Sequence, residues 1–199
     1  NTTARDNTGV GHDVLKTNST GANNTAVGRS SLQSNTTASN NTAVGRSALA
    51  TNTTGTYNIA MGTDALASNT TESYNIAMGT NAMMGATGAQ RCIAIGVNAM
   101  QQLTTGDRNI AIGVNAFDAA TTAHDNVCIG EVAGYALTDG NSYYNVAIGA
   151  YALDSCTKNS NVAIGYGAAT NATTASGNVC IGTWAMNGST TGGSNTIIG

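Results

Sequence analysis

Asn109-Ile110-Ala111-Ile112-Gly113 is one copy of a five-residue motif, Asn-x-Ala-(Val/Ile/Met)-Gly, that recurs along all 199 residues of the chain. Positions 110 and 112 are large and apolar, and they alternate with Asn109 and Ala111, which is the period of two that is typical of a β-strand. The final glycine has no Cβ and can therefore turn the chain with a positive φ. The motif predicts a short strand followed by a turn.

The motif glycine sets the period of an internal repeat. Successive glycines are 17 residues apart, except for one interval of 19 (Gly130 to Gly149) and one of 16 (Gly149 to Gly165). We expect all of them to be turn residues: Gly11, Gly28, Gly45, Gly62, Gly79, Gly96, Gly113, Gly130, Gly149, Gly165, Gly182 and Gly199. A fixed period of this length indicates one structural unit copied twelve times.

The repeat predicts an all-β fold, a parallel β-solenoid of about twelve 17-residue turns. A repeat of 17 residues that includes a strand is too short to supply a pair of helices, so helical solenoids are excluded. At about 4.8 Å per turn the array would be a rod about 53 Å long. The repeat runs into both ends of the sequence, and we therefore expect residues 1–199 to be a single repeat array within a longer fibre protein.

Two apolar columns are expected inside the solenoid. The residue before each glycine is always Val, Ile or Met, as in Ile112, and the residue four positions after it is usually Leu, Met or Phe, as in Leu49. The middle of nearly every strand is small, as in Ala111, with Cys128 and Cys180 in place of Ala and with Gly9 and Ile197 at the ends of the array. Such smallness over many turns predicts close packing, either across a thin solenoid or against a neighbouring chain.

The motif asparagines form another column, which is broken once by Cys92. Its central members are Asn24, Asn41, Asn58, Asn75, Asn109, Asn126, Asn145, Asn161 and Asn178. Asparagines stacked about 4.8 Å apart can hydrogen-bond along a ladder and satisfy backbone groups of the turns, and we favour this structural role over ligand binding.

Composition excludes several classes of partner. Only 9% of residues are charged, and the net charge of -3 offers no electrostatic attraction for nucleic acid. No apolar run approaches the roughly 20 residues that a membrane span needs, so no membrane insertion is expected. The four cysteines contain no Cys-x-x-Cys pair, and we expect small buried thiols in preference to disulfides or metal ligands.

The sequence 41–49, Asn-Thr-Ala-Val-Gly-x-x-Ala-Leu, followed by Asn52-Thr53-Thr54-Gly55, resembles the repeats of phage tail fibres and of trimeric autotransporter adhesin heads. The resemblance implies a left-handed β-roll, a homotrimer, and a place in a virion appendage or at the cell surface, where it supports attachment to a host or surface. In such a trimer the alanine column would face the threefold axis or a closely apposed sheet.

The sequence contains no pattern of catalytic residues. The two histidines, His12 and His124, are more than six turns apart, and the acidic residues are scattered. No nucleotide-, zinc- or calcium-binding motif occurs. We therefore predict that the chain is not an enzyme and holds no cofactor or metal. An alternative to the fibre or adhesin is the non-catalytic shaft of a tailspike whose enzyme domain lies outside this chain.

Aromatic residues are concentrated where the period is irregular. The candidates for contact with a host-surface glycan or protein are Tyr135, Tyr143, Tyr144, Tyr151, Tyr166 and Trp184. Filling of a bulge or of a seam between chains is the alternative. The threonine pairs, such as Thr36-Thr37, raise a second function, an ice-binding solenoid, although adjacent threonines do not predict a flat face of two columns.

Overall fold

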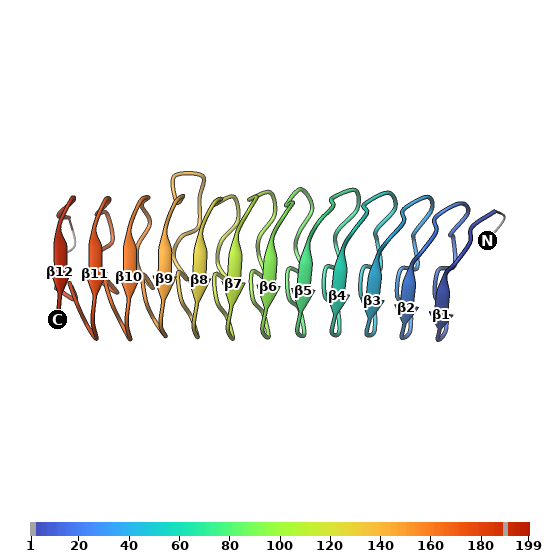
Figure 1. The fold of residues 1–199 in the computed structure, drawn as a ribbon, viewed down its shortest axis with the longest axis horizontal. Coiled ribbons are helices and arrows are strands. Elements are labelled where there is room, and N and C mark those ends of the chain that lie inside the picture. Colours follow the sequence, from blue (N-terminus) through green and yellow to red (C-terminus); the bar gives the residue numbers. More distant parts are fainter. Residues whose placement is uncertain (1–2, 189–190) are drawn as a thin grey trace.

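The fold, described by a computed structural model for residues 3–188 and 191–199, is a rod built on a single parallel sheet (Figure 1). Its strands are β1 (Thr8–Val10), β2 (Thr25–Val27), β3 (Thr42–Val44), β4 (Ile59–Met61), β5 (Ile76–Met78), β6 (Ile93–Ile95), β7 (Ile110–Ile112), β8 (Val127–Ile129), β9 (Val146–Ile148), β10 (Val162–Ile164), β11 (Val179–Ile181) and β12 (Thr196–Ile198). Their order in the sheet is their order in the sequence, so the chain advances one strand per turn through about eleven turns. The predicted parallel β-solenoid is confirmed.

The strands pair in the register of the repeat. Ala94 lies beside Ala111, which lies beside Cys128, so each sequence column is also a column in space. The 19-residue interval keeps this register, because Val127 pairs with Val146 and the extra residues form the loop that projects between β8 and β9 (Figure 1). No helix in the described ranges has the length and apolarity required to cross a membrane.

The alanine column faces the interior of its own chain. Ala111 is fully buried, as are Cys128 and Cys180. The leucine column is the opposing wall: the sulfur atoms of Cys180 and Met186 lie 3.2 Å apart. Leu49 and Phe117 of that wall are also fully buried. Of the two alternatives for the small column, packing across a thin solenoid is therefore correct, and burial at a threefold axis is wrong for these residues.

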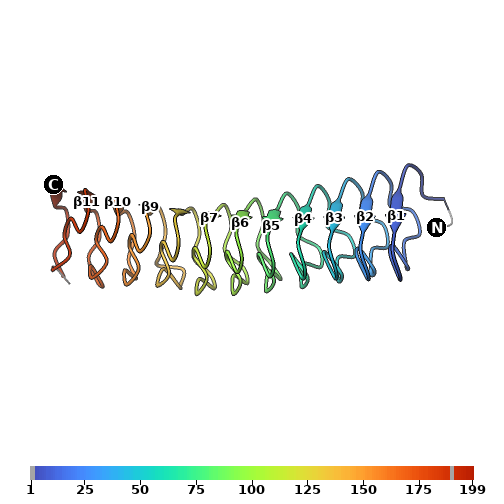
Figure 2. The same ribbon diagram turned by 90° about the horizontal axis from the view of Figure 1, so that it is seen from below.

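The column before the glycine lies outside, which corrects our expectation that it is part of the core. Met61 is 40% exposed and Ile95 is 36% exposed, while Ile112 is half-buried. The physical reason is strand alternation: the residues before and after Ala111 point to the face opposite to it, and the space between the walls accommodates only small side chains. Figure 2 shows the strands along one side of the rod and the rest of each turn along the other.

The turns depend on residues with positive φ. The motif glycines have φ values between 124° and 141°. Residues of the leucine column also have positive φ, as at Leu49 (50°) and Met83 (48°). A β-branched side chain is strained in this conformation, which favours the Leu, Met and Phe that fill most of this column.

The motif asparagines form a hydrogen-bonded ladder next to the strands. The Oδ1 atom of Asn58 accepts the backbone N–H of Asn75 at 3.0 Å, and its Nδ2 donates to the carbonyl of Glu72 at 2.8 Å. At the break in the column, the sulfur of Cys92 accepts the backbone N–H of Asn109 at 3.4 Å. Each side chain thus satisfies backbone groups that the turns would otherwise bury without a partner.

The structure shows a second asparagine ladder, formed by Asn18, Asn35, Asn52 and Asn69, which the sequence did not lead us to expect. Asn35 donates its side-chain amide to Asn18 at 2.8 Å, and Asn69 donates to Asn52 at 2.9 Å. The ladder ends where Ala86 takes the next position and offers no donor. As a result Oδ1 of Asn69 has no hydrogen-bond partner, one of two such buried side-chain atoms in the described residues.

Candidate interaction surfaces

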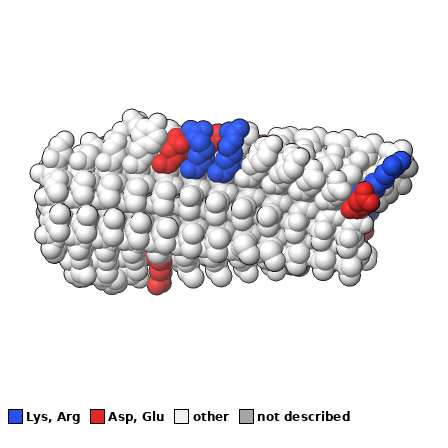
Figure 3. All heavy atoms as spheres, in the orientation of Figure 1, with Lys and Arg blue, Asp and Glu red and all other residues white. Residues whose placement is uncertain are grey.

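The outward side of the twelve strands forms one continuous surface along the rod, which we call the outer sheet face. It consists of two columns, the first and third residue of every strand, for example Ile110 and Ile112 of β7. All residues in these columns are Thr, Val, Ile or Met, and none is charged. In the view of Figure 3 the broad middle of the rod, where the strands of Figure 1 lie, carries no charged side chain.

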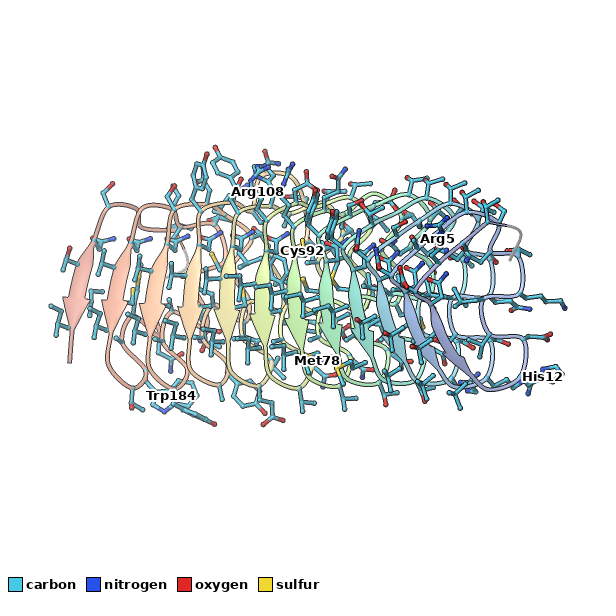
Figure 4. The ribbon with its side chains drawn as sticks, turned by 45° about the vertical axis from the view of Figure 1, so that its right-hand side comes forward. Arg5, His12, Met78, Cys92, Arg108 and Trp184 are labelled. Atoms are coloured by element: carbon cyan, nitrogen blue, oxygen red, sulfur yellow. The ribbon has the colours of Figure 1, made fainter. Side chains whose placement is uncertain are left out.

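The aromatic candidates do not gather at one place. Tyr143 and Tyr144 lie immediately before β9, whereas Tyr151, Tyr166 and Trp184 follow the ends of β9, β10 and β11. Figure 4 shows the corresponding edges on opposite sides of the rod, with Arg108 at the edge where strands begin and Trp184 at the edge where they end. Tyr135, which is 40% exposed, belongs to neither group, and its ring contacts no other aromatic ring among residues 3–188 and 191–199.

The edge where the strands end carries what we call the aromatic row, Tyr151, Tyr166 and Trp184. The ring centroids of Tyr151 and Tyr166 are 5.8 Å apart at 74°, and those of Tyr166 and Trp184 are 5.1 Å apart at 85°. Edge-to-face contacts of this kind are favourable for aromatic rings and hold their orientation. Tyr166 and Trp184 remain 47% and 45% exposed, so the row is ordered and accessible at once.

The opposite edge carries a second group near the projecting loop. The rings of His124 and Tyr143 are stacked 5.3 Å apart at 4°, and Tyr144 meets Tyr143 edge to face at 5.1 Å. The loop itself is tied by Asp139, whose carboxylate accepts the backbone N–H of Asn141 at 2.9 Å. The loop thereby places Tyr144 outward, as the most exposed of the tyrosines.

The second group continues into a column that sequence reasoning did not single out. Tyr57 and Tyr74 stack 5.3 Å apart at 2°, and the next residues at the same spacing of 17 are Arg91 and Arg108. These positions lie twelve residues after the motif glycines. Aligning every column at the period of the repeat, and not only the apolar ones, could have found them.

Charges along this column are balanced. Arg108 donates to both oxygens of Asp125 at 2.6 and 2.8 Å, and Nδ1 of His124 lies 2.8 Å from the same carboxylate. The hydrogen bonds from Arg108 lower the pKa of the Asp125 carboxyl to about 2. Asp125 and Arg108 are therefore held together in an ion pair. His12, the other histidine, pairs instead with Asp13 at 3.2 Å near β1.

The four cysteines are buried and free of disulfides, as expected for small buried thiols. Burial raises the pKa of the Cys92 thiol to about 11, and it raises the pKa of Cys128, Cys156 and Cys180 as well. The thiols are therefore protonated and unreactive near neutral pH. Among residues 3–188 and 191–199, no three His, Cys, Asp or Glu side chains gather in a way that could hold a metal ion.

The threonine pairs present one outward column, as strand-like alternation predicts. The hydroxyl of Thr36 donates to the carbonyl of Thr53 at 3.0 Å and that of Thr53 to the carbonyl of Thr70 at 3.0 Å, so the first members of these pairs lie in a ladder. The second member, such as Thr37 or Thr54, is exposed.

The part of the chain that the structure describes encloses no pocket. Comparisons of the chain with protein-family models, curated proteins and solved structures find no match.

Proposed function

We propose that the chain is a rod-shaped structural segment of a homo-oligomeric fibre or adhesin that supports attachment to a host or another surface. The observation that carries the proposal is the outer sheet face. Its length of about 53 Å and width of roughly 10 Å give an apolar area on the order of 500 Å². A contiguous apolar patch of this size lies in the upper part of the range that soluble monomers expose, and such patches often mark interaction sites.

A second copy of the same chain is the best match for this face. Both partners have the same rise per turn, so apolar columns can meet turn for turn along the whole rod, which a partner of unrelated fold cannot do. Polar and charged residues border the face: Arg46 and Glu131 come directly after the motif glycines that end their strands, and Arg91 and Arg108 stand two residues before β6 and β7. An apolar centre with a polar rim is the usual anatomy of a protein interface.

The proposed oligomer is a homotrimer in which the outer sheet faces meet around the axis. The resemblance to tail-fibre and adhesin repeats supports three copies, a left-handed roll, and a location on a virion appendage or cell surface. The scarcity of charge supports a structural role, because neutral polar ladders and uniform turns make a stiff spacer and require no catalytic group.

Substitution of Ile112 by arginine tests this proposal. The wild-type chain should form trimers in mass photometry or analytical ultracentrifugation, whereas Ile112→Arg should be shifted to monomers, because an unpaired cation would be buried in each copy of the interface. Thr105→Arg is the matched control, since it adds the same charge to an exposed threonine of the neighbouring turn segment. A wild-type chain that stays monomeric at micromolar concentration would rule out the self-assembling fibre.

Ice binding is a second candidate, and the outer sheet face favours it more than the threonine pairs do. The face presents two columns about 7 Å apart along each strand, with Thr8, Thr25 and Thr42 beside Val10, Val27 and Val44. These two columns of mostly β-branched residues are the two-column array that the threonine pairs lack. An ice-binding chain would produce thermal hysteresis as a monomer, and Ile112→Arg would abolish it. A wild-type solution without thermal hysteresis removes this candidate.

A further inference from the structure

The aromatic row is built into the fold at one specific position, Gly167. In the other turns, the second residue after the motif glycine has a side chain, such as Asn98, Asn115 or Tyr151. A Cβ at Gly167 would lie on the face of the Trp184 indole, against Cε3, Cζ3 and Cδ2. The glycine therefore allows the Trp184 ring to lie face-on against the backbone of the preceding turn. An indole seated in this way keeps a fixed, partly exposed surface.

The row is flanked by hydrogen-bonding groups. Glu131 is exposed, and its backbone carbonyl accepts the N–H of Tyr151 at 3.0 Å, so it belongs to the turn directly before the row. Thr183, also exposed, precedes Trp184 at the other end. Flat apolar rings bordered by a carboxylate and a hydroxyl match the two sides of a pyranose, which has apolar C–H faces and hydroxyl groups at its rim.

The charge of this edge selects among sugars. The segments 130–135, 149–154, 165–170 and 182–187, which carry the row and its neighbours, contain Glu131 and Asp154 but neither Lys nor Arg. An anionic chain, such as a nucleic acid or a polysaccharide of uronic acids, would meet only repulsion here. The edge where the strands begin differs, because it carries Arg91, which is exposed, and Arg108, which is paired with Asp125.

We infer that the aromatic row binds the sugar rings of an uncharged polysaccharide that lies along the rod. Trp184 and Tyr166 supply the stacking surfaces, and Glu131 accepts hydrogen bonds from sugar hydroxyls. Because the row follows successive turns, neighbouring sugars of one chain would contact neighbouring turns. The inference names the ligand of the proposed attachment function and builds on it, but it does not require oligomer formation.

Trp184 is the single tryptophan of the chain, so its fluorescence reports on this site alone. The full chain is titrated with hexasaccharides of β-linked glucose, β-linked N-acetylglucosamine, α-linked glucose and α-linked mannose, and with an oligogalacturonate as the acidic comparison. We expect at least one uncharged oligosaccharide to shift the Trp184 emission saturably. The acidic oligosaccharide should have no effect.

Two variants localise the binding. Tyr166→Ala should weaken binding about tenfold, that is by about 1.4 kcal/mol, since a few central residues, tyrosine and tryptophan prominent among them, carry most of the energy of a contact. Tyr57→Ala, which removes an equally exposed tyrosine from the opposite edge, should leave it unchanged. If no uncharged sugar changes the emission, if the acidic one binds best, or if Tyr57→Ala is as harmful as Tyr166→Ala, the inference is wrong.

The oligomeric state of the same samples separates this inference from the proposed fibre. If the chain is monomeric and binds an uncharged sugar, the proposed fibre is wrong and the proposed sugar site is supported. If the chain is a trimer and binds no sugar of the panel, the proposed fibre is supported and the proposed sugar site is wrong.

Discussion

Replacing Ala111 by arginine is expected to unfold the turns around β7 and to leave little folded chain at room temperature. Ala111 is fully buried between the sheet and the leucine wall of the same turn, so a guanidinium there would have neither space nor a counter-charge. A buried unpaired charge costs several kcal/mol, which is a large fraction of the stability of an ordinary domain. Circular dichroism during heating and the soluble yield would measure the loss.

Ile112→Arg is the matched control for this experiment, because it places the same side chain one residue away on the outer sheet face. It should keep the β-sheet signal of the wild type and affect assembly alone. If Ala111→Arg instead folds as well as Ile112→Arg and differs from the wild type only in assembly, the alanine column is a seam between chains, and the packing described above is incorrect.

Replacing Gly79 by valine is the second change with a large expected effect, a loss of roughly 2–6 kcal/mol of unfolding free energy. Backbone strain contributes about 1–3 kcal/mol, because Gly79 has a φ of 139° that a β-branched residue rarely adopts. Overpacking contributes a similar amount, because a Cβ at Gly79 would collide with the backbone carbonyl of Gly96 in the next turn. Neighbouring turns should be affected, since repeats are coupled through their interfaces.

Urea unfolding followed by circular dichroism would measure this loss. Thr80→Val is the control, because it introduces the same side chain at an exposed neighbour whose column already carries Val97 and Val114. Thr80→Val should leave the free energy of unfolding nearly unchanged. A Gly79→Val chain with the stability of Thr80→Val would contradict the role of this glycine in the stacking of turns.

Much of the fold could be predicted because the same constraint is repeated in every turn. A period of 17 with one glycine per period leaves few architectures, and stacked asparagines need partners wherever they stand. The leucine column was identified correctly, because large γ-branched side chains in register have no other place to pack. The candidate surfaces were harder: the period of 17 places Tyr57, Tyr74 and Arg91 in one column, but only the stacked turns show that the rings of Tyr57 and Tyr74 are in contact.

The sequence by itself determined the strand, the turn and their spacing, since these depend on local alternation and on a residue without a Cβ. Only the tertiary structure decided which side of the strand is inside. Ile112 is more apolar than Ala111, and an expectation based on apolarity alone therefore put Ile112 in the core. From β2 to β11 the two walls of the roll stand close together, so alanine or cysteine fills the gap between them and the larger residues are left on the outer sheet face; Ile197 takes this position only in the last strand, β12.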